Sequence, residues 1–275
     1  MVAKVSLSVY KARLVGLLAA MKGPREVYHH MTACSTCLRM SLKAVNFLSA
    51  LGDTLQEQYV ANVMLLCDVE DLAVATMGQS TNPRHRRMRI SSTTENAIRT
   101  RGGNFEALAL GMCRPKRFTD KAARDFHAHA DLGLLVQKDI YSLLFQTGLV
   151  VMPEQPWLCC SPDGLIQVSG ETVLIEIKCP ESCKTRPIFD HEAVICNVAY
   201  LTNTDVELSL EPPKPHYTQV QVQLYVLNLR KAIFYVYCPK GSKSVLVKRD
   251  ERFIMEAVPK LEYFYFTHFL LMLFK

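Results

Sequence analysis

The chain has 275 residues, of which 49% are hydrophobic, a content that allows a sizeable core and fits a long single α/β domain. Its 32 lysines and arginines exceed its 26 aspartates and glutamates, and the net charge of +6 suits a polyanionic partner without proving one. The 10 cysteines are scattered, several of them within apolar runs, which argues against a disulfide framework. We therefore expect an intracellular protein with reduced thiols, in either the nucleus or the cytoplasm.

Two apolar segments resemble targeting or membrane sequences but are too short. Residues 14–21 look like the core of a signal peptide, and we expect them to form a helix face instead. Residues 263–274 are interrupted by His268 and fall short of the roughly 20 residues that a membrane span needs. Cys34 and Cys37 form half of a zinc pattern with no second pair nearby. The sequence thus predicts neither a membrane span nor a zinc site.

Helical periodicity and positive charge characterise the first part of the chain. Residues 1–75 show the periodicity, and we expect a helical region without chemistry. After a turn-rich break at 78–83, a basic run at 84–89 leads into the hydroxyl-rich segment 91–94. Such a run is either a solvated face or, beside a helix N-terminus, part of a phosphate pocket. Further basic residues are consistent with contacts along a nucleic-acid backbone: Arg99, Arg101, Arg114, Lys116, Arg117, Lys121 and Arg124.

The middle of the chain predicts a helix over 118–147, a short strand at 149–151 and a turn at 153–157. After the segment described next, residues 180–215 read as a connection that is partly helical around 190–200.

The segment 161–180 carries the chemistry. A Pro-Asp-Gly turn at 162–164 precedes a β-branched run at 172–178, which is bounded by Gly and Pro and predicts a strand. Glu176 and Lys178 then share one face of that strand. If Asp163 folds over the same face, two carboxylates and one ammonium converge as a Mg²⁺ site able to cleave a phosphodiester. The alternative is a salt bridge on an edge strand, because D…E-x-K is common by chance.

Strict polar–apolar alternation marks 217–226 and by itself predicts a strand. Residues 232–238 and 244–248 read as a hairpin, and Asp250 with Glu251 begins a final helix.

Four blocks in order resemble the PD-(D/E)xK nuclease superfamily and, within it, the YqaJ-type viral recombinase family that includes phage lambda exonuclease. They are R-R-M-R-I-S-S-T at 86–93, S-P-D-G at 161–164, E-I-K at 176–178 and Y-T-Q-V-Q at 217–221. The resemblance implies a restriction-endonuclease-like α/β core, with a central mixed β-sheet flanked by helices. It implies a nuclease domain over 78–275, preceded by a helical N-terminal extension over 1–77. It also places the glutamine block on a helix, where Gln219 and Gln223 share a face, and we prefer this to the strand.

Carried over by position, the resemblance makes Asp163 and Glu176 ligands of Mg²⁺, for which Mn²⁺ can substitute, with help from the Ile177 carbonyl. Lys178 would position or activate the attacking water. The residues implied in binding DNA and its 5′-phosphate are Arg86, Thr93, Ser161, Gln219 and Gln221.

One position departs from the family. A glutamate is expected on the helix before the P-D block, but alternative alignments place Val136 or Gln137 there. Gln137 can offer a carbonyl oxygen to a metal but no charge, which weakens a site for a hard cation.

The resemblance implies a metal-dependent exonuclease that degrades one strand of duplex DNA 5′→3′ from a 5′-phosphorylated end. The alternatives are a degenerate relative that binds DNA ends or recombination partners without cleaving, and an endonuclease built on the same core. Duplex DNA ends are the implied partner. A ring-shaped homo-oligomer and a single-strand annealing protein are compatible with the family, although the residues themselves indicate neither.

Overall fold

The computed structural model describes residues 47, 50, 53–59, 62–63, 72–73, 76, 83–114, 144–145, 147–152, 155–204, 207–212 and 214–275. Most of the predicted N-terminal helical region and of the helix predicted over 118–147 lies outside these residues. Helix α4 (Asp53–Tyr59) belongs to the former. The helix predicted over 118–147 is wrong at Leu144 and Phe145, which form a strand paired with Leu165 and Ile166.

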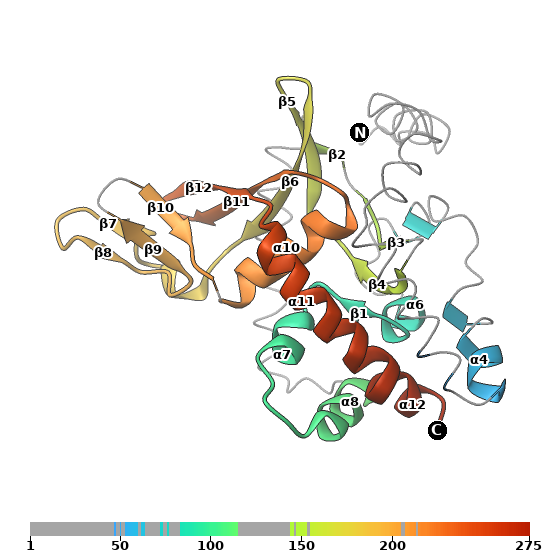
Figure 1. Cartoon of the computed structure of the whole chain (residues 1–275). Helices are drawn as coiled ribbons and strands as arrows, with labels where there is room; N and C mark the ends of the chain where they lie inside the picture. Colours follow the sequence, from blue (N-terminus) through green and yellow to red (C-terminus); the bar gives the residue numbers. More distant parts are fainter. Residues whose placement is uncertain are drawn as a thin grey trace.

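The central sheet has five strands in the order β12-β11-β6-β5-β2. Strands β6 and β11 are parallel, and the other neighbours are antiparallel, so the sheet is mixed. Helix α10 (Pro215–Val226) connects β6 to β11 as a crossover and lies across the sheet (Figure 1). The predicted mixed α/β architecture is therefore confirmed. The strands are β2 (Leu144–Phe145), β5 (Gly164–Val168), β6 (Glu171–Lys178), β11 (Lys231–Cys238) and β12 (Gly241–Lys248).

A three-stranded sheet lies beside the central one, in the order β1-β4-β3. Strand β1 (Ile90–Ser91) runs parallel to β4 (Gln155–Cys160), and β3 (Val150–Met152) pairs antiparallel with β4. Two small hairpins project on the left of Figure 1. They comprise β7 (Phe189–Asp190) with β8 (Ile195–Cys196), and β9 (Leu201–Thr204) with β10 (Glu207–Leu210).

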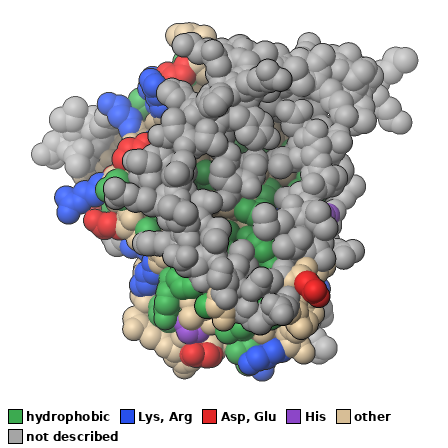
Figure 2. Space-filling model, turned by 45° about the vertical axis from the view of Figure 1, so that its right-hand side comes forward, with side chains coloured by type: hydrophobic (Ala, Val, Ile, Leu, Met, Phe, Trp, Pro, Cys, Tyr) green, Lys and Arg blue, Asp and Glu red, His purple; other side chains and the backbone are tan. Residues whose placement is uncertain are grey.

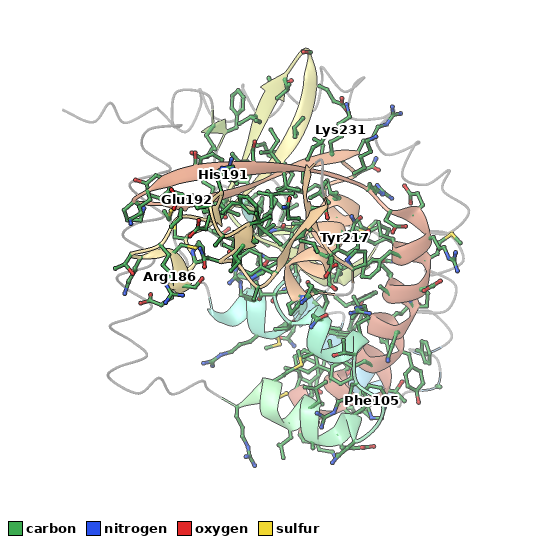
Figure 3. All side chains as sticks on the ribbon, turned by 90° about the vertical axis from the view of Figure 1, so that its left-hand side faces the viewer. Phe105, Arg186, His191, Glu192, Tyr217 and Lys231 are labelled. Atoms are coloured by element: carbon green, nitrogen blue, oxygen red, sulfur yellow. The ribbon has the colours of Figure 1, made fainter. Side chains whose placement is uncertain are left out.

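The C-terminal helix α11 (Glu251–Phe264) passes in front of α10 and continues through the π-helical turn η3 (Tyr265–Phe269) into α12 (Leu270–Leu273). In Figure 3 the labelled Tyr217 lies on α10 beside α11, and its hydroxyl donates a hydrogen bond of 2.8 Å to Asp250 Oδ2. The remaining helical elements are α6 (Pro83–Arg87), α7 (Glu95–Arg99), α8 (Phe105–Cys113) and the 3₁₀ turn η2 (Glu181–Cys183). No helix among the described residues is long and apolar enough to cross a membrane.

Two hydrophobic clusters hold this arrangement. One surrounds Trp157, which is 1% exposed and packs against Tyr265 and Phe266 of the C-terminal helical segment. The other fills the space between α10 and the central sheet, with Leu224 of the helix and Phe234 of β11 fully buried. The site described below lies where these layers meet.

The burial of helix α10 explains why the polar–apolar alternation at 217–226 suggested a strand. Every residue from 217 to 226 is buried, because the helix is enclosed by the sheet, α7 and α11. A helix buried on all sides has no polar face to impose a period of 3.6 on its sequence. The helix implied by the resemblance is confirmed, and the strand suggested by the pattern is wrong.

The other elements predicted from the sequence are confirmed in some segments and wrong in others. The strand at 172–178, the hairpin over 232–248 and the final helix capped by Asp250 are confirmed. The helical stretch around 190–200 is wrong. Asp190 Oδ1 instead accepts the backbone N–H groups of Glu192 and Ala193 and supports a hairpin turn. The turn over 153–157 is also wrong from Gln155 onward, where the fully buried strand β4 begins.

Charge of both signs lies along one margin of the described surface in Figure 2. Figure 2 shows Lys and Arg side chains in blue along one margin of the molecule, interspersed with red Asp and Glu. Of the basic residues expected along a nucleic acid, those at 116–124 lie outside the described residues. This margin therefore does not by itself identify a nucleic-acid path.

Candidate active site

Strand β6 positions two charged side chains on one face, as its alternation predicts. Glu176 is 2% exposed, and Lys178 Nζ forms an ion pair with Glu176 Oε1. Ile175 and Ile177 point to the other face, where they pack with Leu144 of β2. The backbone pairs of β6 with β5 and β11 fix this register, so both charges must lie on the same side of the central sheet.

Asp163 joins this pair from the turn between β4 and β5. Its Oδ2 accepts the backbone N–H of Ile177 at 2.7 Å, which anchors the carboxylate at the end of β6. The next residue, Gly164, pairs with Ile175, and a Cβ there would lie 2.3 Å from Leu144 Cδ2. The Gly is therefore needed for the close packing that follows Asp163. The predicted convergence of two carboxylates and one ammonium is present.

The electrostatics of the three groups are coupled. Burial, followed by the negative charge of Glu176, raises the pKa of Asp163 to about 7, while Lys178 and the Ile177 N–H oppose this rise. Burial would lower the pKa of Lys178, but the charges of Glu176 and Asp163 together outweigh it and raise that pKa above its ordinary value. Lys178 is therefore a charged ammonium at neutral pH. A buried group of this kind beside two carboxylates is typical of a functional site.

The glutamines of α10 approach the same carboxylate. Gln219 Nε2 donates to Glu176 Oε1 at 2.6 Å, and Gln223 Nε2 donates to Glu176 Oε2 at 2.9 Å. The two glutamines are four residues apart and share a helix face, as expected. Gln221 lies elsewhere. Its Nε2 donates to the Lys248 carbonyl and its Oε1 accepts the Asp250 N–H, so we leave Gln221 out of the candidate site.

The residues suggested for the 5′-phosphate follow adjacent strands. Because β1 is parallel to β4, Thr93 and Ser161 both follow the carboxyl ends of these strands, at the same edge. Thr93 Oγ1 and Ser91 Oγ share a hydrogen bond of 2.9 Å, which adds a second hydroxyl that the sequence reasoning did not assign. Burial raises the pKa of the Cys160 thiol well above its usual value, and Arg86, in α6, lies close enough for its charge to oppose this rise. The three residues therefore border the same end of β4.

Glu95 is a buried acid that sequence reasoning missed. It begins α7, is 1% exposed, and neither carboxylate oxygen accepts a hydrogen bond from a side chain among the described residues. Burial raises its pKa well above the usual range; its own backbone N–H opposes this rise and the charge of Glu176 adds to it. Its neighbour Asn96 accepts from Thr218 of α10 at 3.2 Å, next to Gln219. An acid in the first turn of a helix is commonplace, so the sequence carried no signal for it.

The third metal ligand expected from the sequence cannot be located. Gln137, Val136 and their acidic neighbours lie outside the described residues. Within the described part of the chain, no group of three His, Cys, Asp or Glu side chains is placed to hold a metal ion. The described carboxylates that face each other at the end of β6 are thus Asp163 and Glu176.

Solved structures with a similar chain path include two exonucleases and a DNA complex. An alkaline exonuclease, LHK-Exo from Laribacter hongkongensis, is 17% identical, with 65% of this chain and 87% of that chain covered and a TM-score of 0.46. A phage-related exonuclease from Haemophilus somnus 129PT is 12% identical, with coverages of 65% and 94% and a TM-score of 0.41. A SOX–DNA complex is 12% identical, with coverages of 96% and 92% and a TM-score of 0.44.

Among curated proteins, no sequence matches this chain significantly. The family model described as the YqaJ-like viral recombinase domain matches residues 114–230, a segment that contains Asp163, Glu176, Lys178 and the glutamines of α10. The resemblance drawn from the motifs is thereby confirmed. Residues 114–230 of the chain are thus similar to the YqaJ-like viral recombinase domain.

Proposed function

We propose that this protein is a divalent-metal-dependent exonuclease that hydrolyses duplex DNA from a 5′-phosphorylated end. The observation that carries the proposal is the convergence of Asp163, Glu176 and Lys178 at the end of β6, within a YqaJ-like domain. Buried charges of this kind are costly unless a cation or a substrate uses them. Phosphodiester hydrolysis needs both a cation and a fixed positive charge beside the reacting phosphate.

The donor atoms at this place suit a hard cation. Asp163 and Glu176 offer carboxylate oxygens, and the Ile177 carbonyl, in the residue directly after Glu176, is a further oxygen donor. Oxygen donors of this type favour Mg²⁺ and accept Mn²⁺. When bound, the cation would stabilise negative charge on the phosphate and lower the pKa of the attacking water. Gln137 remains a candidate for a further ligand.

Two groups of the protein, the Lys178 ammonium and the Ile177 N–H, would assist the reaction beside the cation. Lys178, held by its ion pair with Glu176, places a positive charge where the transition state becomes more negative. The N–H of Ile177 holds Asp163 in one orientation, so the carboxylate requires little reorganisation when a cation binds. Preorganisation of this kind lowers the barrier more than a mobile charge could.

The 5′→3′ polarity would follow from a terminal-phosphate pocket. Arg86, Thr93, Ser161 and Gln219 are the candidates, since Arg, hydroxyl and amide groups donate to phosphate oxygens. Their elements meet at the carboxyl end of β4, and Gln219 connects this region to Glu176. A phosphate held there would place the adjacent phosphodiester near the carboxylates. A homo-oligomer around DNA and a single-strand annealing partner remain compatible with this function.

The test uses linear duplex DNA with a 5′-phosphate, the same DNA with a 5′-hydroxyl, and a closed circle. With Mg²⁺ or Mn²⁺ we expect nucleotide release from the linear substrates, fastest with the 5′-phosphate, and none with a chelator. A label at the 5′ end should be released before a label at the 3′ end of the same strand. Early loss of the 3′ label would contradict the polarity.

Two other outcomes would favour the alternative functions. Nicking of the closed circle would indicate an endonuclease. Binding of DNA ends without release of nucleotides would indicate a non-cleaving relative, and Gln137→Glu then tests whether a missing carboxylate is the cause.

A further inference from the structure

Glu176 is held from both sides by amide groups. Gln219 donates to one of its oxygens and Gln223 to the other, at 2.6 and 2.9 Å. Gln223 is completely buried and Gln219 is 9% exposed, so water does not compete for these hydrogen bonds. Because each oxygen accepts from one of these amides, and Oε1 also pairs with Lys178, the carboxylate cannot rotate about its terminal bond without breaking these bonds.

Gln223 donates to Glu176, but its own amide oxygen is left without a partner in the described part of the chain. Its Oε1 is buried and has no hydrogen-bond partner among the described residues. Leaving such a buried acceptor unpaired is destabilising. An apolar residue of similar length, such as Met, would fill the same space between helix and sheet without that cost. A buried polar residue that violates this rule is expected where function requires it.

Gln219 is oriented from its other end. Burial, followed by the charge of Lys178, lowers the pKa of His216, and a hydrogen bond with the Gln219 side chain opposes this shift. The Nε2 group of Gln219 is directed to Glu176. The His216 ring is itself fixed, because it packs edge-on against Tyr200 with ring centroids 4.3 Å apart. His216, Gln219 and Glu176 thus form a chain of three side chains.

We propose that Gln219 and Gln223 form an amide clamp that holds Glu176 in the orientation in which it binds a divalent cation, with Gln223 as a positioning residue dedicated to this task. The inference rests on the proposed function, since it takes Glu176 to be a ligand. Loss of a side chain that orients a metal ligand typically weakens metal binding by about 10- to 100-fold. Gln223 is the better of the two to test, because Gln219 is also a candidate for phosphate binding.

The test is the affinity of the purified full chain for Mn²⁺, measured by calorimetry or by the electron paramagnetic resonance of free Mn²⁺, without DNA. Gln223→Met keeps the length of the side chain and removes the donor. Gln221→Met is the matched control, since Gln221 is equally buried on the same helix but bonds Lys248 and Asp250. We expect Gln223→Met to raise the dissociation constant about 10- to 100-fold, and Gln221→Met to leave it unchanged.

The possible results distinguish a failure of the amide clamp from a failure of the proposed function. Equal Mn²⁺ affinity in the wild type and Gln223→Met would overturn the clamp and leave the proposed function standing. No Mn²⁺ binding by the wild type would overturn both. If Gln223→Met does not fold, as judged by circular dichroism, Gln219→Met tests the clamp at the other oxygen with the same expected loss. Unchanged affinity in that variant would also overturn it.

Discussion

Titration of Glu95 should make the free energy of unfolding depend on pH, and the substitution Glu95→Gln should remove this dependence. Glu95 is 1% exposed, and neither carboxyl oxygen accepts a hydrogen bond from a side chain among the described residues. Burial raises its pKa well above the usual range; the backbone N–H of Glu95 opposes that rise, and Glu176 adds to it. Glu95→Gln replaces the group by a neutral one of nearly the same shape, so packing is preserved and the titration is lost.

The sign follows from proton binding. Because the folded pKa of Glu95 is above the unfolded value of 4.5, the folded state keeps a proton that the unfolded chain has released. The stabilisation from the protonated group is complete below the unfolded pKa and is lost as the pH rises through the folded pKa. One proton corresponds to a slope of at most about 1.4 kcal/mol per pH unit. The free energy of unfolding of Glu95→Gln relative to the wild type should therefore increase with pH over this window.

The assay is urea denaturation of both proteins at several pH values from about 4 to 8, with a chelator present. Glu256→Gln serves as the control, because the Glu256 side chain is 71% exposed and pairs only with Arg252 at 3.4 Å. We expect the difference between Glu95→Gln and wild type to be smallest near pH 4 and to grow towards pH 8, with no such trend for the control. A difference that stays constant across the range would show that Glu95 does not titrate as argued.

Two further substitutions test local features of the fold. Asp250→Ala removes an oxygen that accepts the Phe253 N–H at 3.0 Å and another that accepts the Tyr217 hydroxyl, and should lower the free energy of unfolding by about 1–2 kcal/mol in urea titrations. Asp250→Asn keeps the cap and should lose clearly less; an equal loss would contradict the capping argument. Gly164→Ala places a Cβ 2.3 Å from Leu144 Cδ2 and should cost about 1–3 kcal/mol. Leu144→Ala in the same chain should relieve that cost, and strictly additive changes in thermal unfolding of the four proteins would refute the clash.

Local patterns predicted strand β6 well. The β-branched residues of 172–178, bounded by Gly and Pro, are sufficient to predict β6 and to place Glu176 and Lys178 on one face. The final helix, α11, was also predictable from its local sequence, because Asp250 caps it through a local hydrogen bond. In these segments the interactions that determine the structure join residues close in sequence, so local patterns are enough to predict them.

Tertiary enclosure explains what the sequence alone could not predict. Helix α10 is buried on every side, so its alternation suggested a strand, and only the ordered motifs indicated a helix. Glu95 looks like an ordinary acid in a first helical turn, but packing of α7 against α10 removes it from water. The hydrogen bond from the Ile177 N–H to Asp163 joins residues 14 positions apart, and no local pattern specifies it.

The most direct test of the account compares two lysines. Lys178 and Lys231 lie on the adjacent strands β6 and β11, and each pairs with a glutamate, but Lys231 pairs with Glu171 near the opposite end of β6. The initial rate of nucleotide release from linear, 5′-phosphorylated duplex DNA should fall roughly 100-fold or more in Lys178→Met, and remain at the wild-type level in Lys231→Met. Wild-type release by Lys178→Met would contradict the central claim that Asp163, Glu176 and Lys178 form the active site.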